Sequence, residues 1–425
     1  MDRPNKKSSG KILIITEKFP NVIQPWLANT VAQIKKKGFY LQIISMHEGD
    51  KSYAKIIDDY HLRDHTITVR LDGFSNLVTI FKGFCSFTRV VNYLKIILRL
   101  DLSCRSYKNW SRKLVSRLSL ASVLRDIDAQ IVHSHFEISG YKILPIISAM
   151  GAKFVITFHG LPPPGVSMLS ERARKEYVEM ATIILVNTEF AKKQYVNLGA
   201  DEKKIRILPQ GTDLQIFTFC ENRSRSTEKR GLSLLCVGRL SPDKGQEYVL
   251  EAVSYLKRDG VEFKLVIVGQ GPDRARLEGL IHKYDIKGHV HIESGLSERQ
   301  LVDKYHSADM FILASTSSTD GYHEETQGVA IQEAQACGAL VIATKVGGIP
   351  ECIVDGENAF LVNERSGVDI YKKILWLREN ESMWDSWRAN ARRHVEEKYD
   401  IEKIGEKLSY VYSCLLANKN VPKSL

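Results

Sequence analysis

The chain repeats one pattern twice: short apolar runs alternate with stretches of helical periodicity. In the first half the runs that we expect to be strands are 11–16, 40–45, 131–134, 154–158, 183–187 and 205–208. In the second half they are 232–237, 263–268, 290–293, 310–314 and 340–343. Strands that alternate with helices form parallel sheets covered by helices on both faces. The sequence therefore predicts an α/β protein with two doubly wound domains that face a cleft, with ligands at the carboxyl ends of the strands.

The length supports two domains, because 425 residues exceed what one hydrophobic core usually serves. We expect an N-terminal domain over residues 1–218 and a C-terminal domain over 231–398. Residues 219–230 are polar, lack apolar periodicity and are predicted to link the two. Helical patterns follow Gly356, and the last one, within 399–425, is expected to return to the N-terminal domain.

The apolar runs also bear on location. None approaches the roughly eighteen residues that span a bilayer. The run at 11–16 after the basic N-terminus is too short for a signal peptide, so we expect a cytoplasmic protein. The seven cysteines include no close Cys-x-x-Cys pair, which favours reduced cysteines packed in the core.

Part of the net charge of +10 is concentrated between residues 82 and 118. Nine lysines and arginines there alternate with apolar and aromatic residues, against a single acidic residue, Asp101. A basic amphipathic stretch suits an anionic membrane surface, here the inner face of the cell membrane, where the protein would be peripheral. A solvated helix face that covers the core explains the same pattern, and both interpretations stay open. We do not expect a nucleic-acid partner, because no recognition motif accompanies the charge.

The segment from Glu325 to Glu333 carries the strongest functional signal. Seven residues separate its two carboxylates, and a short helix of small residues follows. The first glutamate, ahead of the helix, can reach sugar hydroxyls, and the second, inside it, can reach a ribose. Gly328 and Val329 at the helix start allow backbone amides to approach phosphate groups. The segment predicts a grip on two points of a sugar nucleotide.

Two cations, Arg239 and Lys244, follow the predicted strand 232–237 in a turn before the next helix. Their charges suit the diphosphate that leaves a sugar nucleotide. In the first half, His159 ends the strand 154–158 and could donate to a sugar hydroxyl or to phosphate; a polar loop histidine is the alternative. The turn at 268–271 is interpreted as a wall of the nucleotide pocket.

Other sequence patterns give weaker evidence of function. His133 and His135 share one face of a strand, but no third ligand at useful spacing appears, so we expect no metal. Asp126 and Asp128 match Asp-x-Asp but precede a strand, which favours a polar turn. No nucleophile elbow, phosphate loop or dinucleotide fingerprint is present, which disfavours hydrolases, nucleotide triphosphatases and dehydrogenases.

With these residues, nearly the whole chain resembles family 4 of the retaining glycosyltransferases, which have the GT-B fold. More narrowly, it looks like bacterial exopolysaccharide and capsule enzymes of the colanic-acid type. The segments that carry the resemblance are 237–245, 325–333, 342–351 and 355–362, with 19–20, 157–160 and 208–213 in the first half.

The resemblance implies retaining, metal-independent transfer of a hexose from a nucleotide sugar to a lipid-linked or oligosaccharide acceptor in surface-polysaccharide biosynthesis. No cofactor is implied, and the donor is expected to be a UDP- or GDP-sugar. The N-terminal domain would bind the acceptor and the C-terminal domain the donor. Glu325 and His159 would lie at the donor sugar and Glu333 at the ribose, Arg239 and Lys244 would neutralise the diphosphate, and Gly295 and Leu296 would line the base pocket.

One departure lies inside the strongest motif. Thr326 stands where the family usually has glycine, which predicts an added side chain beside the donor sugar. Three alternatives stay open: a sugar-nucleotide epimerase of the same fold, a phosphorylase, and a catalytically silent protein that binds nucleotide sugars. The phosphorylase is disfavoured because no pyridoxal lysine motif is evident.

Overall fold

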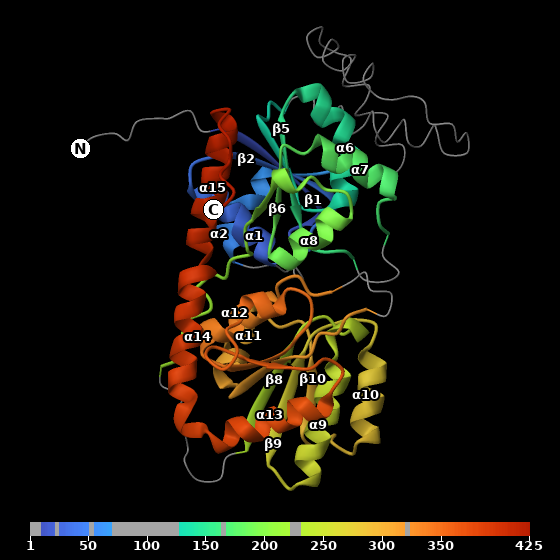
Figure 1. Ribbon diagram of the computed structural model, residues 1–425, viewed down its shortest axis with the longest axis vertical. Coiled ribbons are helices and arrows are strands. Elements are labelled where there is room, and N and C mark those ends of the chain that lie inside the picture. The colour runs from blue at the N-terminus through green and yellow to red at the C-terminus, as the bar shows by residue number, and fades with distance from the viewer. Residues whose placement is uncertain are drawn as a thin grey trace, which may run out of the picture.

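The computed structural model describes residues 10–21, 25–50, 55–69, 127–162, 167–221, 231–318 and 324–425. Two α/β domains lie one above the other along the long axis of the molecule (Figure 1). The basic stretch 82–118, Asp126 and most of the predicted linker fall outside the described residues, so what the sequence indicates there stays a prediction.

The N-terminal domain is built on a seven-stranded parallel sheet in the order β3-β2-β1-β4-β5-β6-β7. The strands are β1 (Lys11–Phe19), β2 (Tyr40–Glu48), β3 (Thr66–Thr68), β4 (Ile131–Ser134), β5 (Lys153–Phe158), β6 (Ile183–Val186) and β7 (Ile205–Ile207). The helices include α1 (Pro25–Lys36), α2 (Ile56–Asp59), α6 (Glu137–Met150), α7 (Glu171–Met180) and α8 (Glu189–Asn197). The strand order reverses between β1 and β4, which is where ligands bind in open α/β sheets.

The C-terminal domain repeats this plan with six parallel strands in the order β10-β9-β8-β11-β12-β13. They are β8 (Leu232–Val237), β9 (Phe263–Val268), β10 (Val290–Glu293), β11 (Met310–Leu313), β12 (Leu340–Thr344) and β13 (Phe360–Val362). The helices are α9 (Gln246–Arg258), α10 (Arg274–Lys283), α11 (Glu298–Ser307), α12 (Val329–Cys337), α13 (Gly367–Glu379) and α14 (Trp384–Lys398); the last helix, α15 (Ile401–Leu416), returns to the N-terminal domain. The order reverses between β8 and β11, so the predicted pair of doubly wound domains is confirmed.

All strands expected from the sequence are present, and β4, β8, β9 and β10 match the expected bounds to the residue. Two strands were not predicted, β3 and β13, which have three residues each. Both lie at the edge of their sheet in the strand order. Three residues are too few to show apolar periodicity, so such strands form because a longer neighbour offers them backbone partners.

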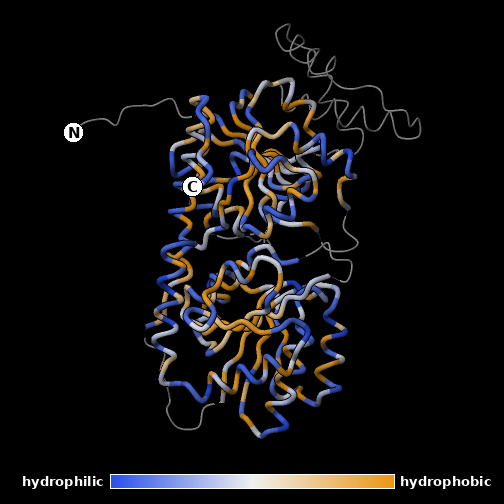
Figure 2. The backbone as a smooth tube through the Cα atoms, in the orientation of Figure 1, coloured by the Kyte–Doolittle hydropathy of each residue, from blue (hydrophilic) through white to orange (hydrophobic). Residues whose placement is uncertain are grey.

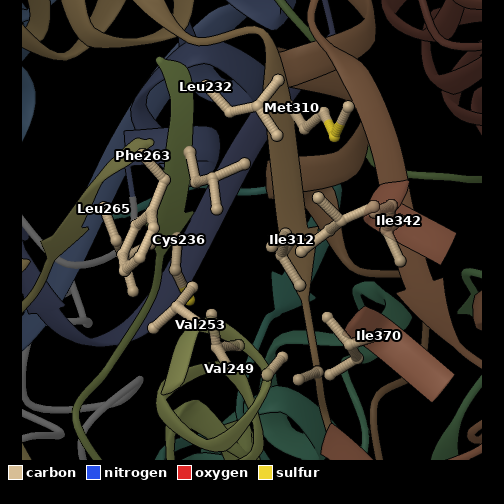
Figure 3. Close-up of a cluster of buried hydrophobic side chains, with 14 of the residues drawn as sticks. Leu232, Cys236, Val249, Val253, Phe263, Leu265, Met310, Ile312, Ile342 and Ile370 are labelled. Carbon is tan, nitrogen blue, oxygen red and sulfur yellow. The ribbon is translucent and has the colours of Figure 1, made fainter. Parts of the chain in front are cut away.

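Buried side chains cover both faces of the C-terminal sheet, and one of the two clusters lies between the sheet and the helices α9 and α13. Side chains from β8, β9, β11 and β12 meet Val249, Val253 and Ile370 from these helices (Figure 3). In the described residues, the central strands of both domains are strongly hydrophobic (Figure 2). Four of the five described cysteines, Cys236, Cys337, Cys352 and Cys414, are buried, and none of the five forms a disulfide, as the sequence predicts for these positions.

The last two helices run along both domains (Figure 1). Helix α14 packs on α12 of the C-terminal domain, and α15 packs on α1 of the N-terminal domain. At the crossing, the amide of Thr212 donates to the carbonyl of Tyr399 at 2.7 Å, and the carbonyl of Thr212 accepts from the amide of Ile401 at 3.0 Å. The apolar face of α15, including Tyr412, is buried in the N-terminal core. Within the described ranges, no helix is both long enough and apolar enough to cross a membrane.

Candidate functional site

The candidate site lies where the carboxyl ends of the two sheets meet. From the N-terminal domain come the loops after β5, β6 and β7, which carry His159, Asn187 and Gln210. From the C-terminal domain come the turn after β8 and the segment 324–328 ahead of α12. The contacts described next join these loops, so residues far apart in sequence form one site.

Lys244 and Glu325 form an ion pair through the ammonium nitrogen and Oε2. Both side chains are mostly buried, with 19% and 18% of their surface exposed. The hydroxyl of Ser315, which directly follows the β11 exit, donates to the same carboxylate oxygen at 3.3 Å. The structure thus brings together two residues that the sequence placed in separate motifs, and it pairs a cation with the carboxylate expected to hold a sugar.

The position of Lys244 depends on Gly245, which follows it at the start of α9. Gly245 has φ +60, and a Cβ there would lie 1.9 Å from the carbonyl oxygen of Ala314. The amide of Thr316 donates to the carbonyl of Asp243 at 2.9 Å. The turn after β8 is therefore pressed against the β11 exit, and only glycine permits this approach.

Arg239, at the start of the same turn, is held by its neighbours. Its Nε donates to the hydroxyl of Ser241 at 3.0 Å, and Nη2 bonds both carboxylate oxygens of Asp243 at 3.2 and 3.1 Å. Within the described part of the chain Nη1 has no hydrogen-bond partner. The guanidinium is thus oriented by the protein while part of it stays free to bind an anion.

The turn at 268–271, predicted to wall the nucleotide pocket, packs on the turn that carries Arg239. The amide of Leu240 donates to the carbonyl of Gln270 at 2.9 Å. A Cβ at Gly271 would lie 2.1 Å from the carbonyl oxygen of Leu240. The glycine thus permits the two turns to touch, and their contact fixes where Arg239 leaves the sheet.

Glu333 lies on α12 and accepts a hydrogen bond from the hydroxyl of Tyr305 at 2.8 Å. Burial raises the pKa of its carboxyl from 4.5 to about 7; the bond from Tyr305 acts in the opposite direction, and Glu298 adds a smaller increase. Gly328, with φ +77, precedes α12, whose first residue is Val329 and whose start has no side-chain cap. The first amides of α12 are therefore available to an anion.

Gly295 and Leu296 lie in the loop after the edge strand β10. Gly295 is exposed with φ +70, and Leu296 packs partly against the buried cluster around α12. The hydrogen bonds described for Glu325 and Lys244 do not involve this loop, so its predicted role at the base pocket rests on its place at the same end of the sheet.

His159 follows β5 and is held on three sides. The ring of Trp26 lies 4.3 Å from it, centroid to centroid. Its Nδ1 lies 2.8 Å from the amide nitrogen of Gln210, and its Nε2 lies 3.2 Å from Nδ1 of His135. Burial, with His135 close by, lowers the pKa of His159 well below its usual range. The ring is neutral, and a bond from it to a ligand must replace one of these two.

His133 and His135 share one face, as the sequence predicts, and their rings stack 4.3 Å apart. The two ring nitrogens of His133 bond the hydroxyls of Tyr412 and Thr157, each at 2.6 Å. Among the described residues no group of three or more His, Cys, Asp or Glu side chains is placed to hold a metal ion. Asp128, which precedes β4, pairs at 2.8 Å with Lys11, the first residue of β1, at the amino ends of these strands and away from the site.

Thr326, predicted to add a side chain beside the donor sugar, contacts the opposite domain. Its side chain turns toward the N-terminal domain and is 6% exposed. The hydroxyl donates to the carbonyl of His159 at 3.2 Å, and the amide of Asn187 approaches it at 3.4 Å. Its carbonyl accepts from Thr188 at 2.9 Å. A Cβ at Gly160 would lie 2.7 Å from the methyl of Thr326. Thr326 therefore joins the two domains.

Two further contacts join the domains, and sequence reasoning missed both. Gln327 bonds the backbone of Gln210 twice: its amide oxygen accepts from the Gln210 amide at 2.8 Å, and its amide nitrogen donates to the Gln210 carbonyl at 2.9 Å. The carboxylate of Glu351 accepts from the backbone amides of Glu189 and Phe190, each at 2.7 Å, at the start of α8. In the sequence, the only feature that pointed to Gln327 and Glu351 was a polar side chain in a segment that follows a strand.

Two family models match the chain. The model described as Glycosyltransferase Family 4 matches residues 78–216, and the model described as Glycosyl transferases group 1 matches residues 221–394. Together they span most of the chain, one in each domain. They meet at the polar segment between the domains.

Relatives match over almost the full length. A Salmonella typhimurium protein named as a putative colanic acid biosynthesis glycosyltransferase, WcaL, is 24% identical over 406 residues, which are 94% of this chain and 98% of that one. The amylovoran biosynthesis glycosyltransferase AmsK of Erwinia amylovora is 24% identical over 404 residues, 92% and 96% of the two chains.

Solved structures share the fold. A glycosyltransferase from Rickettsia africae superposes with a TM-score of 0.71 at 19% identity, covering 97% of this chain and 100% of that one. HepE of Anabaena, solved in complex with UDP-glucose, gives 0.72 at 15% identity, covering 95% and 99%. Identities this low establish the architecture alone, two parallel-sheet domains of the GT-B type.

Proposed function

Because this chain belongs to glycosyltransferase family 4, with the GT-B fold, we propose that it transfers a hexose from a nucleotide sugar to a lipid-linked saccharide during exopolysaccharide biosynthesis. The anomeric configuration of the sugar is retained, and no metal ion takes part. The observation that carries the proposal is the Lys244–Glu325 pair at the carboxyl end of the C-terminal sheet. It lies on the same segment as Thr326, whose hydroxyl bonds the carbonyl of His159.

The diphosphate of the donor takes the place of internal partners. Lys244 and Arg239 are bonded to Glu325 and Asp243, so binding exchanges one anion for another. The ammonium of Lys244 then binds the phosphate in place of Glu325, and Glu325 accepts hydrogen bonds from the sugar hydroxyls. The first amides of α12, at Gly328 and Val329, face the same charge. Glu333 accepts hydrogen bonds from the ribose, and Gly295 and Leu296 contact the base.

In the transfer step the bond between the anomeric carbon and the phosphate oxygen breaks, and its electron pair leaves with the diphosphate. The acceptor hydroxyl forms the new bond on the same face of the sugar, and its proton passes to the departing phosphate oxygen. Negative charge grows on the diphosphate as this happens. Lys244 and Arg239 stabilise that charge, which supports a mechanism without a metal or a protein nucleophile.

The acceptor is proposed from the relatives and from the basic stretch. Relatives of nearly the same length are named for colanic acid and amylovoran biosynthesis. Residues 82–118 would attach the enzyme to the anionic membrane where a lipid-linked acceptor resides. If the protein is produced in cells with intact membranes, it should sediment with them at low salt and be released by high salt. Recovery entirely in the supernatant at low salt would exclude this attachment.

Donor binding tests the proposal. UDP-, GDP- and ADP-sugars are added in turn and the midpoint of thermal unfolding is measured; the true donor stabilises the fold by mass action, by about 2.7 kcal/mol at about a hundred times its dissociation constant. Lys244→Ala should remove the shift. Lys264→Ala, an exposed lysine of β9, should keep it. The proposal fails if no nucleotide sugar shifts the midpoint, or if the donor is converted to an epimer without acceptor.

A further inference from the structure

Gln210 links three parts of the candidate site. It follows β7, and its side-chain amide nitrogen lies 2.8 Å from Nδ1 of His159. An amide nitrogen can only donate, so Nδ1 of His159 accepts and the ring carries its proton on Nε2. The Nε2–H then donates to Nδ1 of His135 at 3.2 Å. Gln210 thereby determines both the tautomer and the orientation of the ring.

Gln210 is in turn fixed by the opposite domain. The side chain of Gln327 bonds its amide and its carbonyl, at 2.8 and 2.9 Å. Gln327 is 1% exposed, so this amide pair is shielded from water. A buried, reciprocal pair of hydrogen bonds holds geometry well, because breaking it leaves two polar groups without partners. Gln327 lies two residues after Glu325, on the segment that is proposed to hold the donor.

We propose that Gln210 is a positioning residue for His159, and that Gln327 transmits the closed arrangement of the two domains to it. This inference rests on the proposed function for the role of His159, but the geometry it claims is independent of any reaction. When the domains separate, Gln327 leaves Gln210, and the ring of His159 loses its fixed tautomer. Closure of the domains therefore fixes the donor-binding segment around Glu325 and the ring of His159 at the same time.

The tautomer gives a test that needs no substrate. The ¹⁵N shifts of the His159 ring are measured in the free full-length enzyme, with its signals identified by their loss in His159→Phe. We expect the proton on Nε2. In Gln210→Glu, which keeps the size of the side chain but presents a carboxylate, the proton should move to Nδ1. Gln215→Ala, an exposed glutamine five residues on, should leave the shifts unchanged. A proton on Nδ1 in the wild type, or unchanged shifts in Gln210→Glu, overturns the proposal.

Kinetics test the link across the domains. A misplaced catalytic group commonly lowers turnover by about tenfold to a hundredfold. Gln210→Ala should lower kcat by about tenfold and change KM for the donor much less. Because Gln327 acts through Gln210, the variant with both glutamines replaced by alanine should lose no more kcat than the single alanine variant with the larger loss. Additive losses would contradict the link. If no transfer is found at all, the proposed function fails while the tautomer measurement still decides the positioning role.

Discussion

The carboxyl group of Glu333 has one hydrogen bond from the residues that the structure describes, the 2.8 Å bond from Tyr305. The carboxyl has a pKa near 7, and no cation in that part of the chain pairs with it to offset its burial. Lys244, by contrast, has a carboxylate partner in Glu325. The lack of a cation beside Glu333 fits a carboxyl that accepts hydrogen bonds from a ligand, because ribose hydroxyls would supply further donors.

At pH 8, Glu333→Gln should therefore stabilise the donor-free protein. The folded-state pKa is raised from 4.5 to about 7, so the folded protein binds more protons than the unfolded chain between these values. Stability then falls as pH rises through this window, by roughly 3 kcal/mol at most. The introduced amide keeps the bond from Tyr305 without the charge. Chemical denaturation should show a gain at pH 8 and none at pH 5; a gain of equal size at both would contradict the assignment.

Among single residues, sequence reasoning found those whose charge suits a ligand: Arg239, Lys244, Glu325 and Glu333. It could not find that Lys244 bonds Glu325, because they lie 81 positions apart and only the fold brings them together. It also could not find that Thr326 bonds the opposite domain, since motif spacing does not say which way a side chain turns. Neutral side chains such as Gln210 carry no charge signal at all.

At the scale of elements, the turn after β8 explains how two cations are presented to the site. The turn is fixed by backbone contacts with the exits of β9 and β11, through Leu240 and Asp243. At Gly245 the turn leaves no room for a side chain, because a Cβ there would lie 1.9 Å from the carbonyl oxygen of Ala314. The turn is thus rigid on account of its neighbours, and the cations are placed before any ligand arrives.

Gly245→Ala should destabilise the protein and weaken donor binding, because the added methyl meets the carbonyl of Ala314 at 1.9 Å. Gly260→Ala is a matched control, since Gly260 has φ +67 and open space around it. The control should cost about 1 kcal/mol from left-handed strain alone. We expect at least twice that loss for Gly245→Ala in urea unfolding. Equal losses in the two variants would show that the contact does not matter.

The elements themselves were largely predictable. Central strands such as β8 and β9 are continuous apolar runs because both faces are covered, and their bounds follow from the sequence. The short edge strands β3 and β13 were not predicted, since pairing with β2 and β12 makes them strands more than their own residues do.

At the scale of the whole molecule, the two domains are joined on the site side by Thr326, Gln327 and Glu351, and along the other side by α15. Helix α15 places Tyr412 against His133, which stacks on His135. The C-terminal helix thus supports the histidines behind the site. The sequence predicted that the last helix returns to the N-terminal domain, but not the contacts of Thr326, Gln327 and Glu351, because these depend on how the domains face each other.

Glu351→Ala should loosen this arrangement. The carboxylate accepts from two amides at the start of α8, a position where a negative charge stabilises by about 1 kcal/mol. Without it, the donor-free protein should show a larger radius of gyration in X-ray scattering, and added donor should reverse the change. Glu357→Ala, an exposed glutamate nearby, should show neither effect. An unchanged radius in Glu351→Ala would mean that this contact does not hold the domains together.

The most direct test of the account compares Glu325→Ala with Glu333→Ala in steady-state transfer of the sugar. If Glu325 holds the reacting sugar and Glu333 the ribose, Glu325→Ala should lower kcat by about a hundredfold or more. Glu333→Ala should chiefly raise KM for the donor. Wild-type turnover in Glu325→Ala would contradict the account.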